Sequence, residues 1–112
     1  MSGEICLILT TVDSEDAARQ MARSLVEQRL AGCVQMLPGI RSLYRWQGSV
    51  EEAGESLIQI KTSPERANEV MRWLEAHHPY ELPEIVRIDA SASAAYAAWL
   101  AGAAAIQESE HD

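Results

Sequence analysis

The stretch CVQMLPGIRSLYRWQGSVEEAGESLIQIKT, residues Cys33–Thr62, decides the fold. Its pattern predicts one long β-hairpin with a first arm over Cys33–Trp46, a second arm over Val50–Thr62, and a turn at Gln47–Ser49. The first arm would span about 46 Å, because a strand rises about 3.3 Å per residue. A compact domain of this size has a diameter of only about 34 Å. One arm therefore extends beyond its own domain by roughly 10 Å.

This overhang predicts an oligomer. Ordinary strands have about five or six residues, and a long, partly apolar hairpin with free edges would aggregate if it stayed unpaired. Pairing with neighbouring copies of the chain is the simplest arrangement that satisfies those edges. The sequence thus predicts a tight homo-oligomer.

The length and composition are those of one globular domain. The chain has 112 residues, of which 47% are hydrophobic and 23% charged, and this is enough for one hydrophobic core. We expect residues 1–106 to form this domain and residues 107–112 to be a frayed polar tail. The net charge of −8 argues against a nucleic-acid-binding protein, which would need a basic surface.

The cysteines and the termini predict a cytoplasmic protein. Cys6 and Cys33 both lie in apolar strand patterns, and two cysteines do not make a disulfide framework. We expect buried free thiols in a reducing compartment. The sequence has no signal-peptide pattern and no run of about 20 apolar residues, so no membrane association is expected.

A strand and an amphipathic helix are predicted before the hairpin. Glu4–Val12 is almost continuously apolar, which is typical of a central strand. Asp13 or Ser14 then caps a helix. Its buried stripe follows the i, i+3, i+4, i+7 spacing and consists of Ala18, Met21, Ala22 and Leu25. Gly32 is expected to end this segment in a left-handed conformation.

A helix, a strand and another helix are predicted after the hairpin. Ser63 is expected to cap the second helix, with Pro64 in its first turn and Pro79 as its end. The last strand is predicted over Glu84–Ala90, and an alanine-rich helix over about Ser93–Ile106. The order β-α-β-β-α-β followed by a helix is an α+β, ferredoxin-like sandwich. Two helices cover one sheet face, and we expect oligomerisation to cover the other.

The hairpin itself is expected to bend and to carry ion pairs. Proline lacks the N–H that a strand ladder needs, so a bend is predicted at Pro38–Gly39. Beyond the bend, cross-strand ion pairs are expected between two arginines and three glutamates: Arg41, Arg45, Glu51, Glu52 and Glu55. Their register stays open because a bulge shifts it.

Two strings in this sequence resemble the CutA family of divalent-cation tolerance proteins. They are LAGCVQMLPGIRSLYRWQGSVEEAGESLIQIKT (Leu30–Thr62) and HHPYELPEI (His77–Ile85). The resemblance covers nearly the whole chain, and it implies a ferredoxin-like subunit in an interlocked homotrimer. It also implies a link to copper and other divalent metals. The family is similar in architecture to nitrogen-regulatory signalling trimers, which bind small ligands at subunit clefts.

His77 and His78 are the candidate metal ligands, because neutral imidazole is the commonest metal ligand. The resemblance implies that two histidines and a cysteine bind copper in some members. Both histidines are present, but the cysteine position is occupied by Thr10, which removes the soft donor that favours Cu(I). We expect a divalent metal, with copper before zinc. The alternative is that His78 packs at the helix end and His77 is solvated.

A second candidate site takes its residues from the matched strings: Cys33, Trp46, Lys61, Tyr80 and Glu84. A lysine–glutamate pair beside aromatic rings can hold a small anionic or zwitterionic ligand. The alternative is a structural salt bridge with an aromatic plug between subunits. For the cysteine, the alternatives are a thiolate ligand and a small buried hydrophobic residue.

The sequence lacks the common enzyme motifs. It has no G-x-S-x-G, P-loop, G-x-G-x-x-G or H-E-x-x-H pattern. The leading prediction is a non-enzymatic metal-binding homotrimer that contributes to metal tolerance. The alternative is a signalling trimer that senses a small molecule in its intersubunit cleft.

Overall fold

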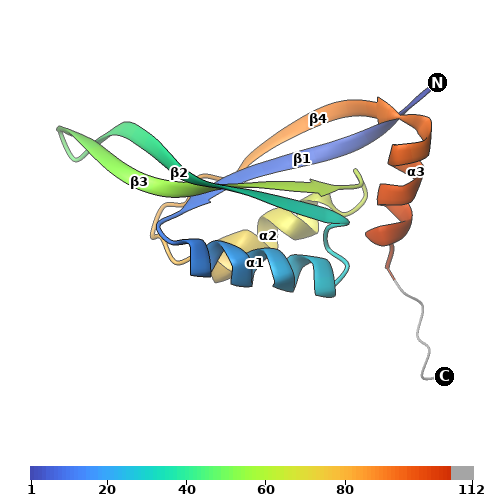
Figure 1. The fold of residues 1–112 in the computed structure, drawn as a ribbon, viewed down its shortest axis with the longest axis horizontal. Helices are drawn as coiled ribbons and strands as arrows, with labels where there is room; N and C mark the ends of the chain where they lie inside the picture. The colour runs from blue at the N-terminus through green and yellow to red at the C-terminus, as the bar shows by residue number, and fades with distance from the viewer. Residues whose placement is uncertain (107–112) are drawn as a thin grey trace.

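Residues 1–106 fold into one antiparallel four-stranded sheet with three helices (Figure 1). The computed structural model describes residues 1–106, and the predicted polar tail over 107–112 lies outside them. The strands are ordered β2-β3-β1-β4 across the sheet. The elements are β1 (Ser2–Val12), α1 (Glu15–Glu27), β2 (Cys33–Trp46), β3 (Ser49–Thr62), α2 (Ala67–His77), β4 (Val86–Ser93) and α3 (Ala94–Ala103). The predicted α+β, ferredoxin-like order is confirmed.

The core lies between the sheet and the helices α1 and α2, which cover the same sheet face (Figure 1). Alternate residues of β1 and β3 point into it, as period-2 strands require. Its largest fully buried side chains include Ile8, Leu25, Ile58, Ile60 and Leu74. No helix among residues 1–106 combines the length and hydrophobicity needed to cross a membrane.

The start of α1 agrees with the prediction. The Ser14 hydroxyl oxygen accepts a hydrogen bond from the Ala17 N–H at 3.0 Å, which satisfies one of the free donors at a helix start. Glu15 and Asp16 lie in the first turn, where the helix dipole favours acids. All four predicted stripe residues are buried.

The end of α1 differs from the prediction. The left-handed residue after the helix is Arg29, with φ of 59°, so the prediction that Gly32 ends the segment is wrong. Gly32 is needed for a different reason, which is close packing against α3. A Cβ at this position would lie 2.7 Å from Leu100 Cδ1 and 3.1 Å from Ala103 Cβ. This contact joins segments far apart in sequence, so local spacing could not reveal it.

Three other boundaries differ from the prediction. The N–H groups of Arg66 and Ala67 donate to the carbonyls of Ser63 and Pro64, so a turn precedes α2 and Ser63 does not cap it. The last strand is displaced towards the C-terminus because β1 offers it partners as far as Ser2, which lies opposite Ser93. The third helix is shorter than expected, with Ser93 as its N-cap.

The hairpin of β2 and β3 leaves the sheet as predicted (Figure 1). The register shifts between Leu37 and Ile40, and Gly39 has φ of 77°, which confirms the bend. Pairing of β3 with β1 reaches only to Ser56, opposite Val12. We call residues 40–55 the outer hairpin. It contributes to a longest dimension of 51 Å.

Of the ion pairs expected in the hairpin, one is present among the described residues. Arg41 Nε lies 3.2 Å from Glu52 Oε2, although Arg41 is directly opposite Gly54. Arg45 lies opposite Val50. The bulge sets this register.

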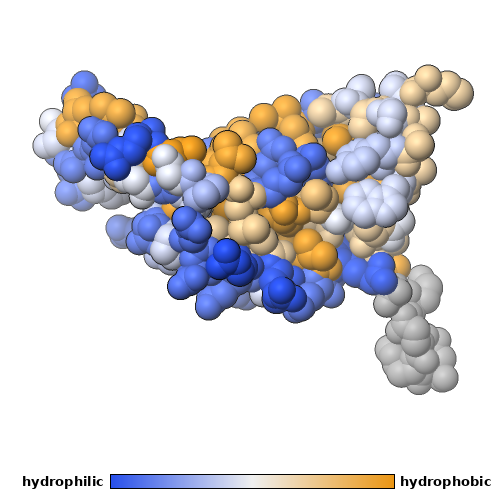
Figure 2. All heavy atoms as spheres, in the orientation of Figure 1, coloured by the Kyte–Doolittle hydropathy of each residue, from blue (hydrophilic) through white to orange (hydrophobic). Residues whose placement is uncertain are grey.

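The sheet face away from α1 and α2 is largely apolar, and we call it the open face. Arg87 on β4 bonds to Asn68 of α2, so its neighbour Ile88 points to the open face. The cross-strand register places the other members. The face carries Leu7, Leu9, Leu37, Leu57, Val86 and Ile88, which are half-buried or exposed. Among them lies a polar pair, Gln59 and Gln35, joined by a hydrogen bond of 3.0 Å. In Figure 2 hydrophobic atoms predominate over the middle of the sheet around a smaller hydrophilic patch, the hairpin at the left is mixed, and the side of α1 is mainly hydrophilic.

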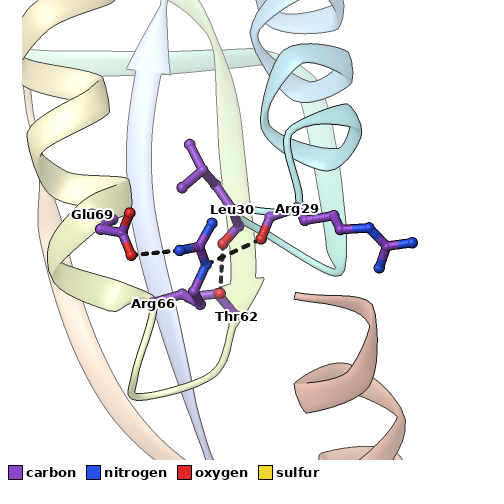
Figure 3. Close-up of polar contacts among 5 residues, drawn as sticks. All are labelled: Arg29, Leu30, Thr62, Arg66 and Glu69. Carbon is purple, nitrogen blue, oxygen red and sulfur yellow. Dashed lines mark hydrogen bonds and ion pairs between the residues drawn. The ribbon is translucent and has the colours of Figure 1, made fainter. Parts of the chain in front are cut away.

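A buried arginine joins the end of α1 to the start of α2 (Figure 3). Arg66 is 7% exposed; its Nε donates to the Arg29 carbonyl at 3.2 Å, and its guanidinium pairs with Glu69. Beside it, the Thr62 hydroxyl donates to the Leu30 carbonyl at 2.7 Å. Arg66 and Thr62 thus donate hydrogen bonds to the backbone carbonyls of Arg29 and Leu30, which follow α1.

Candidate functional site

His78 is a structural link at the end of α2. Its side chain is 9% exposed. Nδ1 accepts a hydrogen bond from the Tyr80 N–H at 3.0 Å, so Nε2 carries the proton and donates to the Thr11 carbonyl at 2.9 Å. Both ring nitrogens are therefore occupied by backbone groups. A metal ion at His78 would have to displace one of them.

His77 has a different environment. It is exposed, its ring stacks on Trp73 with 4.4 Å between centroids, and Nδ1 lies 2.9 Å from the Trp73 carbonyl. Nδ1 therefore carries the proton, and Nε2 is the nitrogen open to an ion. The structure does not direct the two histidines at one point, which matches the alternative that His78 packs at the helix end.

Thr10 stands where the resemblance implies a cysteine ligand. It is fully buried, and its hydroxyl oxygen has no hydrogen-bond partner among residues 1–106. In that part of the chain, no three His, Cys, Asp or Glu side chains gather in a way that could hold a metal ion. Residues 1–106 of a single chain therefore do not fit a preformed metal site.

Tyr80 and Glu55 form a polar contact between the segment after α2 and the hairpin. The Tyr80 hydroxyl donates to Glu55 Oε2 at 2.8 Å. Burial and this hydrogen bond raise the pKa of Tyr80 well above its ordinary value, so the phenol stays a donor. Burial alone would raise the pKa of Glu55, but hydrogen bonds from Ser42, Tyr80 and Thr11 outweigh it and lower the pKa.

Lys61 and Cys33 lie together on the open face. They are directly opposite each other, and Lys61 is also opposite Leu7 on β1. Lys61 is the only lysine of the sequence. Its Nζ lies 5.6 Å from the centre of the Tyr96 ring, and no carboxylate of residues 1–106 pairs with it. The ammonium group of this half-buried lysine can pair with a small anion.

The other predicted ligand-binding residues lie elsewhere in the chain. Trp46 is at the far end of the hairpin, opposite Ser49, and Glu84 is exposed in the loop before β4. Within one chain, the five predicted ligand-binding residues therefore do not form a single site. Cys33 lies opposite Lys61, and Tyr80 lies elsewhere, in contact with Glu55. Sequence reasoning missed Tyr96 as a neighbour of the lysine, because no local spacing relates α3 to β3.

Comparison with known proteins agrees with this fold. The sequence profile described as "CutA1 divalent ion tolerance protein" matches residues 6–103. The divalent-cation tolerance protein CutA of Thermus thermophilus is 44% identical over 95 residues, covering 84% of this chain and 92% of that protein. Mouse protein CutA is 36% identical, and the match covers 77% of this chain but only 49% of the mouse protein.

Solved structures are similarly close. CutA from Synechococcus elongatus superposes with a TM-score of 0.86 at 39% identity, covering 91% of each chain. A second structure of that protein contains a Bis-Tris molecule, with a TM-score of 0.81, 38% identity, and coverage of 89% of this chain and 93% of that one. The profile match covers most of the sequence, and the structural match covers 91% of the chain. This chain therefore belongs to the CutA1 family of divalent ion tolerance proteins.

Proposed function

We propose that this protein contributes to divalent-cation tolerance as a non-enzymatic, cytoplasmic homotrimer. The observation that carries the assembly is the open face, because monomeric proteins seldom expose a large contiguous apolar surface. The strands β2 and β4 form the two edges of the sheet, and free edges favour pairing with another chain. The number three is the one that the family resemblance implies.

Two further features support parts of this proposal. Cys6 and Cys33 are both free thiols, which suits a reducing compartment. The absence of common catalytic motifs from the sequence supports a binding role. The function would then depend on assembly and on what the assembled surface binds.

For the metal itself we propose copper or zinc held loosely through His77. Imidazole nitrogens suit both metals, and His77 Nε2 is open because Nδ1 is occupied by the Trp73 carbonyl. His78 is assigned a structural role, since its nitrogens bind Thr11 and Tyr80. One imidazole per chain favours weak, exchangeable binding over a structural ion.

Calorimetric titration with Cu²⁺ and Zn²⁺ tests this assignment. We expect His77→Ala to weaken the affinity for the metal at least tenfold, because it removes the available donor nitrogen. His111→Ala changes the third histidine of the sequence and is expected to leave binding unchanged. Unaltered affinity in His77→Ala would contradict the assignment, and so would equal losses in both variants.

Lys61 supports a second candidate function, the sensing of a small anionic or zwitterionic molecule between subunits. Its ammonium has an aromatic neighbour in Tyr96 and lies on the face that assembly would cover. The relative from Synechococcus elongatus was solved in complex with a Bis-Tris molecule, which supports small-molecule binding in general but, because Bis-Tris has no anionic group, not the preference for an anion. Cys33, directly opposite, would line such a site.

A thermal-shift screen with small carboxylates, phosphates and Bis-Tris tests this second function. A ligand is expected to raise the melting temperature of the unmodified protein by several degrees and to have no effect on Lys61→Ala. Arg45→Ala serves as the control, because it removes an exposed cation of the outer hairpin. A shift that persists in Lys61→Ala, or a screen without any shift, would rule out the sensor at this place.

A further inference from the structure

The outer hairpin leaves the sheet at Glu55. Ser56 is the last residue of β3 that pairs with β1, and on the other arm the bulge at Leu37–Ile40 interrupts the ladder. Beyond these points the described hairpin is a two-stranded ribbon, and such ribbons are marginally stable alone. Its direction is therefore weakly determined by the sheet and needs another contact.

Tyr80 provides that contact from the body of the domain. Its N–H donates to His78 Nδ1 at 3.0 Å, and the two rings meet edge to face at 4.8 Å. His78 in turn donates to the Thr11 carbonyl near the end of β1. The tyrosine is thus held by the body, and its hydroxyl reaches the first residue of the ribbon, Glu55, at 2.8 Å.

The Glu55 carboxylate is influenced by hydroxyl groups from both sides of the junction. Ser42 lies on the opposite arm of the outer hairpin, and Thr11 lies on β1; against the effect of burial, both side chains help the Tyr80 hydroxyl to lower the pKa of Glu55. Hydrogen bonds to an ionised carboxylate are about twice as strong as those between neutral groups. The bond from the Tyr80 hydroxyl is therefore strongest while Glu55 is ionised.

We infer that the Tyr80–Glu55 contact is a latch that fixes the outer hairpin relative to the body and thereby sets how tightly the subunits assemble. The assembly half of this inference rests on the proposed homotrimer. A ribbon with a fixed direction reaches a neighbouring chain without a further loss of conformational entropy, and such preorganisation strengthens binding. In this inference His78 is a positioning residue that acts through Tyr80.

Hydrogen exchange and sedimentation of the full chain test the latch. In Tyr80→Phe and Glu55→Gln we expect amide exchange in residues 40–53 to rise about tenfold or more, while β1 is unchanged. We also expect the dissociation constant of the assembly to rise by about tenfold or more. Glu52→Gln is the matched control. It also removes a carboxylate of the outer hairpin, but the described partner of that carboxylate is Arg41 on the same hairpin. We expect it to leave both measurements unchanged.

The outcomes separate this inference from the proposed function. Exchange like that of the unmodified protein in both latch variants overturns the latch, even if the protein is a homotrimer. Faster exchange with unchanged assembly overturns the coupling between latch and assembly. An unmodified protein that sediments as a single chain contradicts the homotrimer, while its exchange rates still decide whether the hairpin is latched.

Discussion

Replacing Ile88 with glutamate is expected to separate the assembled protein into single folded chains. Ile88 lies on the open face opposite Leu7 and is 41% exposed in the single chain. A carboxylate there remains solvated in the monomer, so folding should lose less than about 1 kcal/mol. In the assembly it would be buried without a partner, which costs several kcal/mol for each subunit. That cost is repeated in every copy.

Sedimentation velocity at micromolar concentration measures this effect. We expect the unmodified protein to have about three times the mass of one 12.4 kDa chain and Ile88→Glu to have the mass of one. Val26→Glu is a matched control, since Val26 is 42% exposed but lies on α1, away from the open face. Dissociation in both variants, or in neither, would contradict the open face as the subunit interface.

Much of the fold could be predicted because its signals are local. The α1 stripe follows from the 3.6-residue period, and all four members are buried. The bend at Pro38–Gly39 follows from the missing proline N–H, and a register shift is found there. The overhang follows from strand length alone, which is a property of the backbone.

The features that sequence reasoning missed depend on distant partners. The Ala90–Ser93 end of β4 has weak strand propensity, yet it pairs with β1 along its length. Gly32 is of the residue type that commonly ends a helix, but its close contact with α3 explains why glycine is needed there. In each case a segment far along the chain decides the local conformation, and no single window of sequence contains both.

The candidate site shows the same division. His77 and His78 are adjacent and chemically identical, so their sequence positions could not distinguish them. The difference arises from Thr11, which is 67 residues from His78 and whose backbone carbonyl accepts a hydrogen bond from the His78 ring. The residues predicted to bind one ligand also lie in two separate places. Lys61 is near the C-terminal end of β3, opposite Leu7. Tyr80 contacts Glu55, which lies six residues earlier in β3.

Arg66→Ala is expected to lower the free energy of unfolding by about 2–4 kcal/mol, because it removes buried, charge-assisted hydrogen bonds and leaves a cavity. Arg66 donates to the Arg29 carbonyl and pairs with Glu69, so it joins the ends of two core helices. Chemical denaturation at one fixed protein concentration measures the change, since assembly makes stability concentration-dependent.

Two variants decide whether burial and geometry cause this loss. Arg23→Ala removes an exposed ion pair with Glu27 and should cost less than about 1 kcal/mol. Arg66→Lys keeps the charge but lacks the planar fork that serves two acceptors in different directions, so it should recover less than half of the loss. Full recovery by lysine would mean that charge alone is needed. Equal losses at Arg23 and Arg66 would mean that burial of the guanidinium adds nothing to the joint between α1 and α2.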